Sequence, residues 1–398
     1  MRAALAILVF LSAIPDTMAA PVVKELLIDR YHTSVAAAQF FNAVNLLGAL
    51  AAIPLLVALR RRGTVEGMVV GAAAADAVLL AAMILPLGMG WTLALRSLEG
   101  VTDVLVFAGL FDLVRRGGRG HVATNLGVAS IPLLLGLGAG AMIGGAVVRH
   151  TAEESAALWI FGISALLSLV VAGAARGLSL SAPRAVVDAR PMIPAEIEEV
   201  GKGSPVWPAL AMTFSDRAAG GILTGTLPIA LAQVLGYSPT ARGILIGLPL
   251  TVMALGVGPA GWLCDRFGSL RVRIVAGFLY ASSLAMIAIA PDRPWMLAAV
   301  MFTLGVSGSA LFASSLALVV QRGDSTVRLG AFRGAGDLGF LCGGGLSLLL
   351  LSALGGDLPA LGDYQLLILA FAGFHGLTTV IAGGALALWS RATNAAPS

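Results

Sequence analysis

Acidic side chains stand inside several long apolar segments of this sequence. A charged side chain at the centre of a bilayer costs at least about 2.5–3.5 kcal/mol on insertion scales, so such residues usually serve a function. Asp16 follows Pro15 and has no basic residue three or four positions away. Glu99 and Asp103 follow Arg96 at spacings of three and seven residues, which puts all three on one helix face.

Because desolvation disfavours the charged form of a carboxyl group, buried acids of this kind can bind and release protons. The candidate proton carriers are Asp16, Glu99, Asp103, Asp216 and Asp337.

Basic and amide side chains inside the same segments are candidates for a substrate cavity. They are Arg96, Arg217, Arg333, Asn42 and Asn45. The arginines would supply counter-charges to the acids or to an anionic substrate. Arg333 precedes Asp337 by four residues, so these two could instead neutralise each other. Asparagines in such segments are more often packing groups than ligands.

The composition is that of an integral membrane protein. The chain has 398 residues, of which 58% are hydrophobic and only 12% are charged, whereas soluble domains are about a quarter charged. Twelve apolar segments are long enough to span a bilayer as α-helices, the structure in which the backbone satisfies its own hydrogen bonds. They are 4–28, 34–59, 66–88, 91–114, 122–147, 155–178, 207–235, 240–263, 271–290, 294–320, 328–354 and 364–390.

Lys and Arg gather in the loops on one side of these segments, from Arg60–Arg62 to Arg391. The positive-inside rule therefore predicts a multi-pass protein of the bacterial inner membrane with both termini in the cytoplasm. The basic residues form no continuous face, so nucleic acid is not an expected partner. A proline-rich, charged stretch at 181–205 predicts a cytoplasmic linker between an N-terminal six-helix bundle, 1–180, and a C-terminal one, 206–398.

One charged stretch lies between the eighth and ninth segments and reads GWLCDRFGSLR, Gly261–Arg271. It resembles the loop signature of the major facilitator superfamily, G-x-L-x-D-R-x-G-R-[RK]. The matching residues are Gly261, Leu263, Asp265, Arg266 and Gly268, with Arg271 one position late. Arg273 is counted with the same basic loop. The family's N-terminal copy would fall near Arg60–Gly63, where the acid is missing.

Two further motifs support the resemblance. RSLEG, from Arg96 to Gly100, resembles the family's R-x-x-Q-G in the fourth helix. GLGAGAMIGG, 136–145, resembles a fifth-helix motif that is associated with antiporters. Its matching residues are Gly136, Gly140, Gly144 and Gly145. Gly136, Gly140 and Gly144 repeat every four residues and form a smooth stripe that equally suits plain helix packing.

The resemblance implies an all-α membrane fold of twelve helices in two pseudo-symmetric six-helix bundles around a central cavity. It also implies that Asp265 gates the cytoplasmic side by facing the start of the fifth helix, near His121–Asn125, where the helix dipole is positive. Asp76 lies in the third helix, which is peripheral in the family, so we expect a packing or partner role for it.

Function follows from the resemblance and the buried charges together. The leading hypothesis is a proton-coupled exporter of small organic molecules, which works as a monomer without cofactor or metal. The alternative is a proton symporter or uniporter that takes up an organic anion; the three buried arginines and the low aromatic content of 6% favour it. A membrane enzyme is not expected, because the sequence offers no set of nucleophile, base and orienting group.

Overall fold

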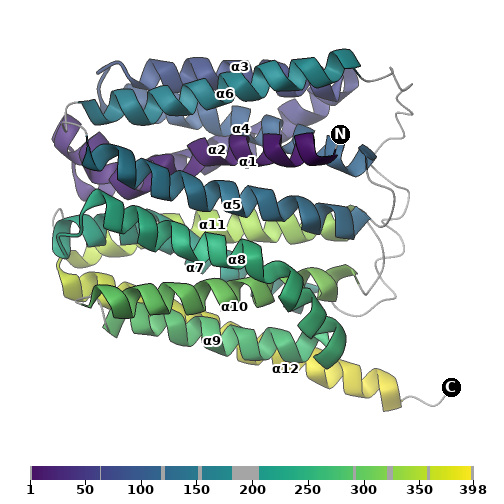
Figure 1. The fold of residues 1–398 in the computed structure, drawn as a ribbon. Coiled ribbons are helices and arrows are strands. Elements are labelled where there is room, and N and C mark those ends of the chain that lie inside the picture. The colour runs from purple at the N-terminus through teal and green to yellow at the C-terminus, as the bar shows by residue number, and fades with distance from the viewer. Residues whose placement is uncertain are drawn as a thin grey trace.

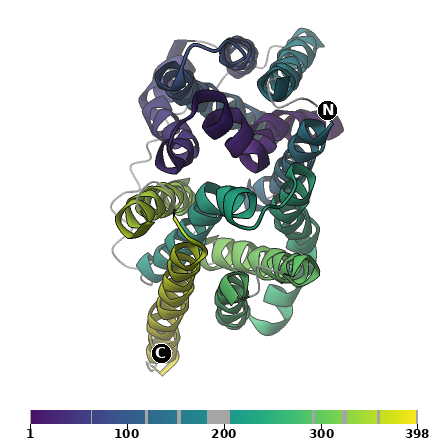
Figure 2. The same cartoon turned by 90° about the vertical axis from the view of Figure 1, so that its left-hand side faces the viewer.

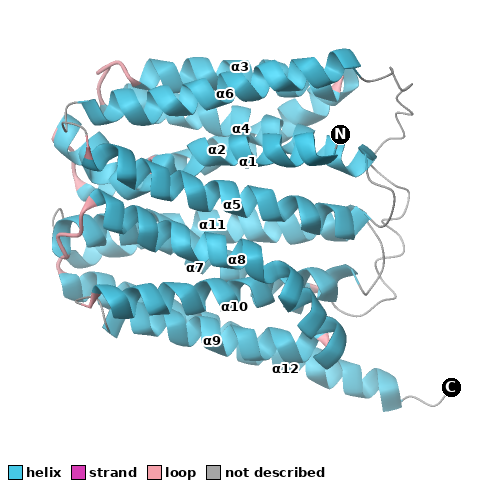
Figure 3. Ribbon diagram, in the orientation of Figure 1, coloured by secondary structure: helices cyan, strands magenta, loops and turns pink. Residues whose placement is uncertain are grey.

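The computed structural model describes residues 2–62, 64–117, 122–150, 155–181, 206–289, 293–320, 326–355 and 359–395. These residues are nearly all helical and include no strand (Figure 3). The long helices are α1 Arg2–Met18, α2 Val35–Arg62, α3 Val65–Met83, α4 Met89–Gly117, α5 Val122–Arg149, α6 Ala156–Ser181, α7 Trp207–Ile229, α8 Pro239–Phe267, α9 Ser269–Ile289, α10 Pro294–Val320, α11 Thr326–Gly355 and α12 Leu361–Ala395. Each predicted segment therefore coincides with a helix.

Two helices continue beyond their α-helical part. A single 3-10 turn, Ala20–Val22, and a π-helix, Lys24–Asp29, follow α1, and another π-helix, Ala230–Val234, extends α7. Ten of the described helices are long and apolar enough to cross a membrane. The other two, α4 and α7, carry charged residues in their middle parts, and these charges belong to the sites described below.

Helices α1–α6 lie together in the upper part of Figure 1, and α7–α12 lie together in the lower part. The view along the helices shows the same two groups (Figure 2). Helix α5 packs on α8, and α2 packs on α11 and α7. The all-α membrane fold predicted from the sequence is confirmed. Both termini lie at the same end of the helices. The linker predicted over 181–205 falls, beyond Ser181, outside the described residues.

The glycine stripe of α5 brings helix backbones close together. A Cβ atom at Gly136, Gly140 or Gly144 would overlap the backbone of α1, and at Gly144 the obstacle is the carbonyl group of Met18. Gly145 lies in the same way against the first turn of α8. The stripe therefore permits close packing of α5 on α1, and Gly145 permits it on α8, as small residues do in membrane helices generally.

Replacing Gly144 with valine is expected to lower the melting temperature of the detergent-purified protein, because overpacking a tight contact costs about 1–3 kcal/mol. Gly173 on α6 is the matched control, since a Cβ atom there would meet nothing within 4 Å. Thermal unfolding of both valine variants measures the difference. Equal melting temperatures would mean that the close approach of α5 to α1 contributes nothing to stability.

Candidate functional site

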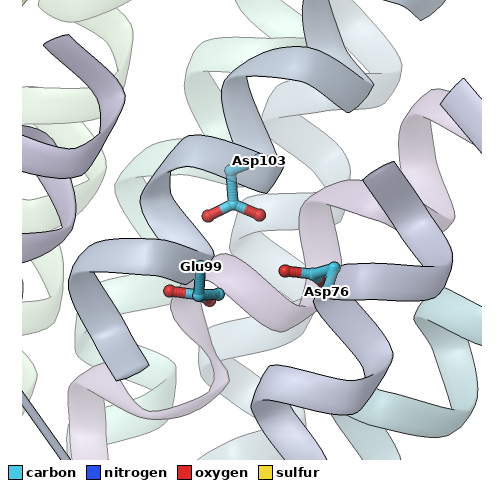
Figure 4. A group of neighbouring side chains, drawn as sticks. All are labelled: Asp76, Glu99 and Asp103. Carbon is cyan, nitrogen blue, oxygen red and sulfur yellow. The ribbon is translucent and has the colours of Figure 1, made fainter. Parts of the chain in front are cut away.

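Charged side chains from three helices of the N-terminal group gather in one place. We call this the acidic cluster; its members are Asp16 on α1, Asp76 on α3, and Arg96, Glu99 and Asp103 on α4. Oxygen atoms of Asp76, Glu99 and Asp103 lie within 4.8 Å of one another, and their carboxyl groups face a common space (Figure 4). The cluster thus combines four acids with one arginine.

Arg96 and Glu99 form the centre of this cluster. The two are an ion pair, and both are buried, with Glu99 fully shielded from solvent. The Arg96 guanidinium also lies over the ring of Phe41, 4.9 Å from its centroid. Asn45 of α2 donates through Nδ2 to Glu99 at 2.8 Å and to Asp103 at 3.2 Å. Asn45, which was predicted to line a substrate cavity, therefore donates its hydrogen bonds to two acids of the cluster instead.

Asp76 is held by hydroxyl groups. Its Oδ1 atom accepts a hydrogen bond from Thr102 at 2.8 Å, and its Oδ2 atom accepts one from Ser168 of α6 at 2.7 Å. Because these bonds tie α3 to α4 and α6, the arrangement agrees with the packing role expected for Asp76.

Asp16 is the least constrained acid of the cluster. Its side chain is partly exposed, and its Oδ1 atom is buried without a hydrogen-bond partner among the described residues. Its carboxyl group lies close enough to Asp103, Glu99 and Arg96 to interact with their charges.

A second set of charges lies among the C-terminal helices. Arg273 of α9 donates to Asp216 of α7 at 2.7 Å and is fully buried. His375 of α12 lies 3.6 Å from the same carboxylate, 3.2 Å from the Ser215 hydroxyl, and next to the ring of Tyr280. The placement of Arg273 in the basic loop was therefore wrong. Helix α9 begins at Ser269, so Arg273 points inward whereas Arg271 stays exposed.

A cavity of about 190 Å³ lies beside these charges, among α7, α8, α9, α10 and α11. Asp216, Arg217 and Tyr280 line it together with leucines, methionines and three phenylalanines. Arg333 and Asp337 pair with each other at 2.8 Å and are not among the lining residues. Arg96 and Asn45 do not line the cavity either, so the structure does not bring the predicted cavity residues together.

The two groups of helices meet from mid-bundle to the end away from the termini. Asn42 of α2 donates a hydrogen bond to the carbonyl group of Thr224 on α7 at 3.2 Å. Thr240 of α8 donates one to the carbonyl group of Gly145 on α5 at 3.3 Å. At the same end, the Glu25 carboxylate accepts hydrogen bonds from both terminal nitrogens of Arg242. The side chains of both residues in this ion pair are buried. Sequence reasoning missed this pair because both residues stand near predicted loops.

The residues of the loop signature lie at the opposite end of α8, and its charged side chains are exposed. Asp265, Arg266 and Arg271 are exposed, and a Cβ atom at Gly261 would meet nothing within 4 Å. Gly268 ends the helix with φ of +86°, a conformation that strongly favours glycine. The expected contact of Asp265 with the start of α5 stays a prediction, because His121 and the side chains that follow it lie outside the described part of the chain.

Comparison with known proteins gives a family match for the C-terminal part of the chain and a shared fold for nearly all of it. Residues 209–397 match the family model of the Major Facilitator Superfamily. The comparison with curated proteins gave no match. Among solved structures, a bacterial homologue of the human lysosomal transporter Spinster, in an inward-facing and unoccupied conformation, is 15% identical, with a TM-score of 0.75 over 98% of this chain and 96% of its own. The nucleoside transporter NupG is 14% identical, with a TM-score of 0.73 over 97% of this chain and 98% of its own. The resemblance to this family is therefore confirmed over residues 209–397, and the structural matches extend the shared fold to nearly the whole chain.

Proposed function

We propose, from the major facilitator match over residues 209–397 and the transporter fold of the whole chain, that this protein is a proton-coupled secondary transporter of small organic molecules. The observation that carries the proposal is the acidic cluster, in which four carboxyl groups share one arginine. Two unit charges 4.8 Å apart repel by about 3–4 kcal/mol at an effective dielectric constant of about 20. A cluster built in this way must hold protons during part of its cycle.

Alternating access would couple those protons to substrate. Asp16 belongs to α1, whereas Arg96, Glu99 and Asp103 belong to α4. A small shift of α1 against α4 changes the distance of Asp16 from the other charges and thereby favours proton uptake in one state and release in the other. Export is the first candidate direction because of the glycine motif in α5. Uptake of an organic anion is the second, and the unpaired Arg217 in the cavity favours it.

The conformation of the molecule fits an inward-facing state. The halves are in contact at the end away from the termini, and positive-inside orientation would put the termini in the cytoplasm. The cytoplasmic end would then carry the exposed Asp265, which we expect to meet the start of α5 when that side closes.

A cysteine at position 265, in a protein whose Cys264 and Cys342 are replaced by alanine, tests this orientation. Asp265 is exposed, so a membrane-impermeant thiol reagent is expected to label the cysteine in inside-out vesicles and not in intact cells. A cysteine at the exposed Ser238, near the other end of the bundle, is the matched control and should label in the opposite way. Labelling of position 265 from outside the cell would reverse the proposed orientation.

Transport by the purified protein in liposomes tests the function itself. With an imposed pH gradient, one class of small organic compound in a panel should accumulate against its concentration gradient, and a protonophore should abolish the accumulation. The sign of the gradient that drives accumulation distinguishes export with proton exchange from uptake with protons. If the accumulation of substrate does not depend on the pH gradient, proton coupling is refuted.

A further inference from the structure

We propose that the cavity among α7–α11 binds a small organic monocarboxylate, with the carboxylate on Arg217 and the apolar part against Phe312, Phe332 and Phe340. This names the substrate class and rests on the proposed transport function for its physiological meaning, although binding can be measured without transport.

Among the described residues, one cation beside the cavity forms neither a hydrogen bond nor an ion pair. Asp216 is matched by Arg273 at 2.7 Å. Arg217 lines the cavity, is exposed to it, and has neither a hydrogen bond nor an ion pair with any described residue. The neighbouring pair on α11 is matched within itself at 2.8 Å. The described groups around the cavity therefore sum to one positive charge, which suits a ligand with one negative charge.

A second donor is available in the cavity wall. Ser315 of α10 lines the cavity and is only 2% exposed, yet its hydroxyl group has no hydrogen-bond partner in the described part of the chain. The hydroxyl groups of Thr213 and Thr224 donate to carbonyl groups of their own helix, so they can only accept from a ligand. A buried hydroxyl without a partner costs free energy, and a carboxylate oxygen would relieve that cost. Arginine also suits a carboxylate geometrically, since its planar fork donates two parallel hydrogen bonds.

The other residues that line the cavity set the polarity and the size of the rest of the ligand. Leucines, methionines and the three phenylalanines offer apolar surface for a ring or a short chain. The volume of about 190 Å³ is below the roughly 300–1,000 Å³ of sites for drug-sized ligands. An amine would bring a second cation to Arg217, and a neutral compound would leave the arginine uncompensated. A compact carboxylic acid satisfies both the charge and the volume.

Binding of matched probes to the full-length protein in detergent, at one pH and without a gradient, tests the assignment. Benzoate, phenylpropionate and octanoate are compared with benzamide and benzylamine by ligand-dependent thermal shift and by isothermal titration. At least one carboxylate is expected to bind, and to bind better than both the neutral and the cationic compound. Arg217→Gln should weaken that binding by at least about tenfold, as expected for the loss of a charge-assisted contact.

Two further variants keep the result interpretable. Arg217→Lys retains the charge without the fork and should bind more weakly than wild type but more strongly than Arg217→Gln. Arg293→Gln removes an exposed arginine outside the cavity and should bind like wild type. The proposal is overturned if no carboxylate binds, if the amine or amide binds equally well, or if Arg293→Gln and Arg217→Gln lose binding alike. Carboxylate binding by a protein whose transport ignores pH would refute proton coupling and leave this assignment standing.

Discussion

Replacing Asp16 with asparagine is expected to abolish accumulation of substrate driven by a pH gradient, while exchange and downhill flux continue. One pH unit is worth about 1.36 kcal/mol, so coupling to one proton supports about a tenfold concentration ratio per pH unit. The variant should bring that ratio close to one. Asparagine preserves the size of the side chain and some of its hydrogen bonding but cannot exchange a proton.

Asp16 is the best candidate proton carrier in the acidic cluster because, among the described residues, its carboxyl group has the fewest hydrogen bonds and ion pairs. Glu99 is fixed by Arg96 and by Asn45, and Asp76 accepts two hydroxyl hydrogen bonds. Asp16 instead retains a buried oxygen without a partner. It also stands on a different helix from the arginine, so the conformational change can alter its surroundings.

The liposome assay should be run with Asp103→Asn and Glu99→Gln beside Asp16→Asn, because these acids are the competing carriers. Asp76→Asn is the matched control for loss of a buried acid in a packing role, and it should keep coupling even where the melting temperature falls. If Asp16→Asn still concentrates substrate with the wild-type pH dependence, Asp16 is not the coupling residue.

The helical framework could be predicted from the sequence because each spanning segment needs a long apolar run, and lipid leaves the backbone no alternative. The chemistry of single segments could also be predicted. The ion pairs Arg96–Glu99 and Arg333–Asp337 lie within one helix turn or little more, so their spacing reveals them.

Pairs between helices could not be predicted in this way. Arg273 and Asp216 are 57 residues apart, and nothing local distinguishes Arg273 from the exposed Arg271 two positions earlier. Residues two apart on a helix face nearly opposite directions, so the start of α9 at Ser269 decides which arginine is buried. Charge-counting rules treat both alike, and the cavity partners of α7 were therefore missed.

The fold also separates the two kinds of chemistry. The acidic cluster lies among α1, α3 and α4, whereas Arg217 and the cavity lie among α7–α11. A proton bound in one group of helices and an anion bound in the other cannot interact through a direct contact. If the proposed coupling exists, it passes through the contact surface between the groups, so the buried ion pair in that surface is the point to perturb.

Replacing Glu25 with glutamine is expected to shift the protein away from the conformation described here and to impair transport. The bidentate pair of Glu25 with Arg242 is buried and joins the segment after α1 to the first turns of α8. Removing one partner of a buried pair costs about 3–5 kcal/mol, which corresponds to a change of roughly 100- to 1,000-fold or more in the ratio of two conformations. The substitution shifts the ratio of the two conformations only if the ion pair of Glu25 and Arg242 is broken in one of them.

Thiol labelling measures the shift directly. Thr240 lies partly buried in the same contact and bonds Gly145, so a cysteine at position 240 should react faster in the Glu25→Gln background than in the wild type. Asp29→Asn is the matched control, since the pair of Asp29 with Lys24 lies in the same π-helix, is about 30% exposed and stays within one segment. Breaking an exposed pair of this kind costs about 0–1 kcal/mol, so labelling should not change.

The charge-swapped protein, Glu25→Arg with Arg242→Glu, distinguishes a gate from a simple support of the fold. A gate needs the attraction in one state and its loss in the other, so the swap should restore much of the slow labelling and of the transport rate. If Glu25→Gln labels and transports like the wild type, the pair does not hold the two halves together in the transport cycle. If Glu25→Gln melts earlier but leaves position 240 as slow as in the wild type, the pair stabilises the fold without gating it.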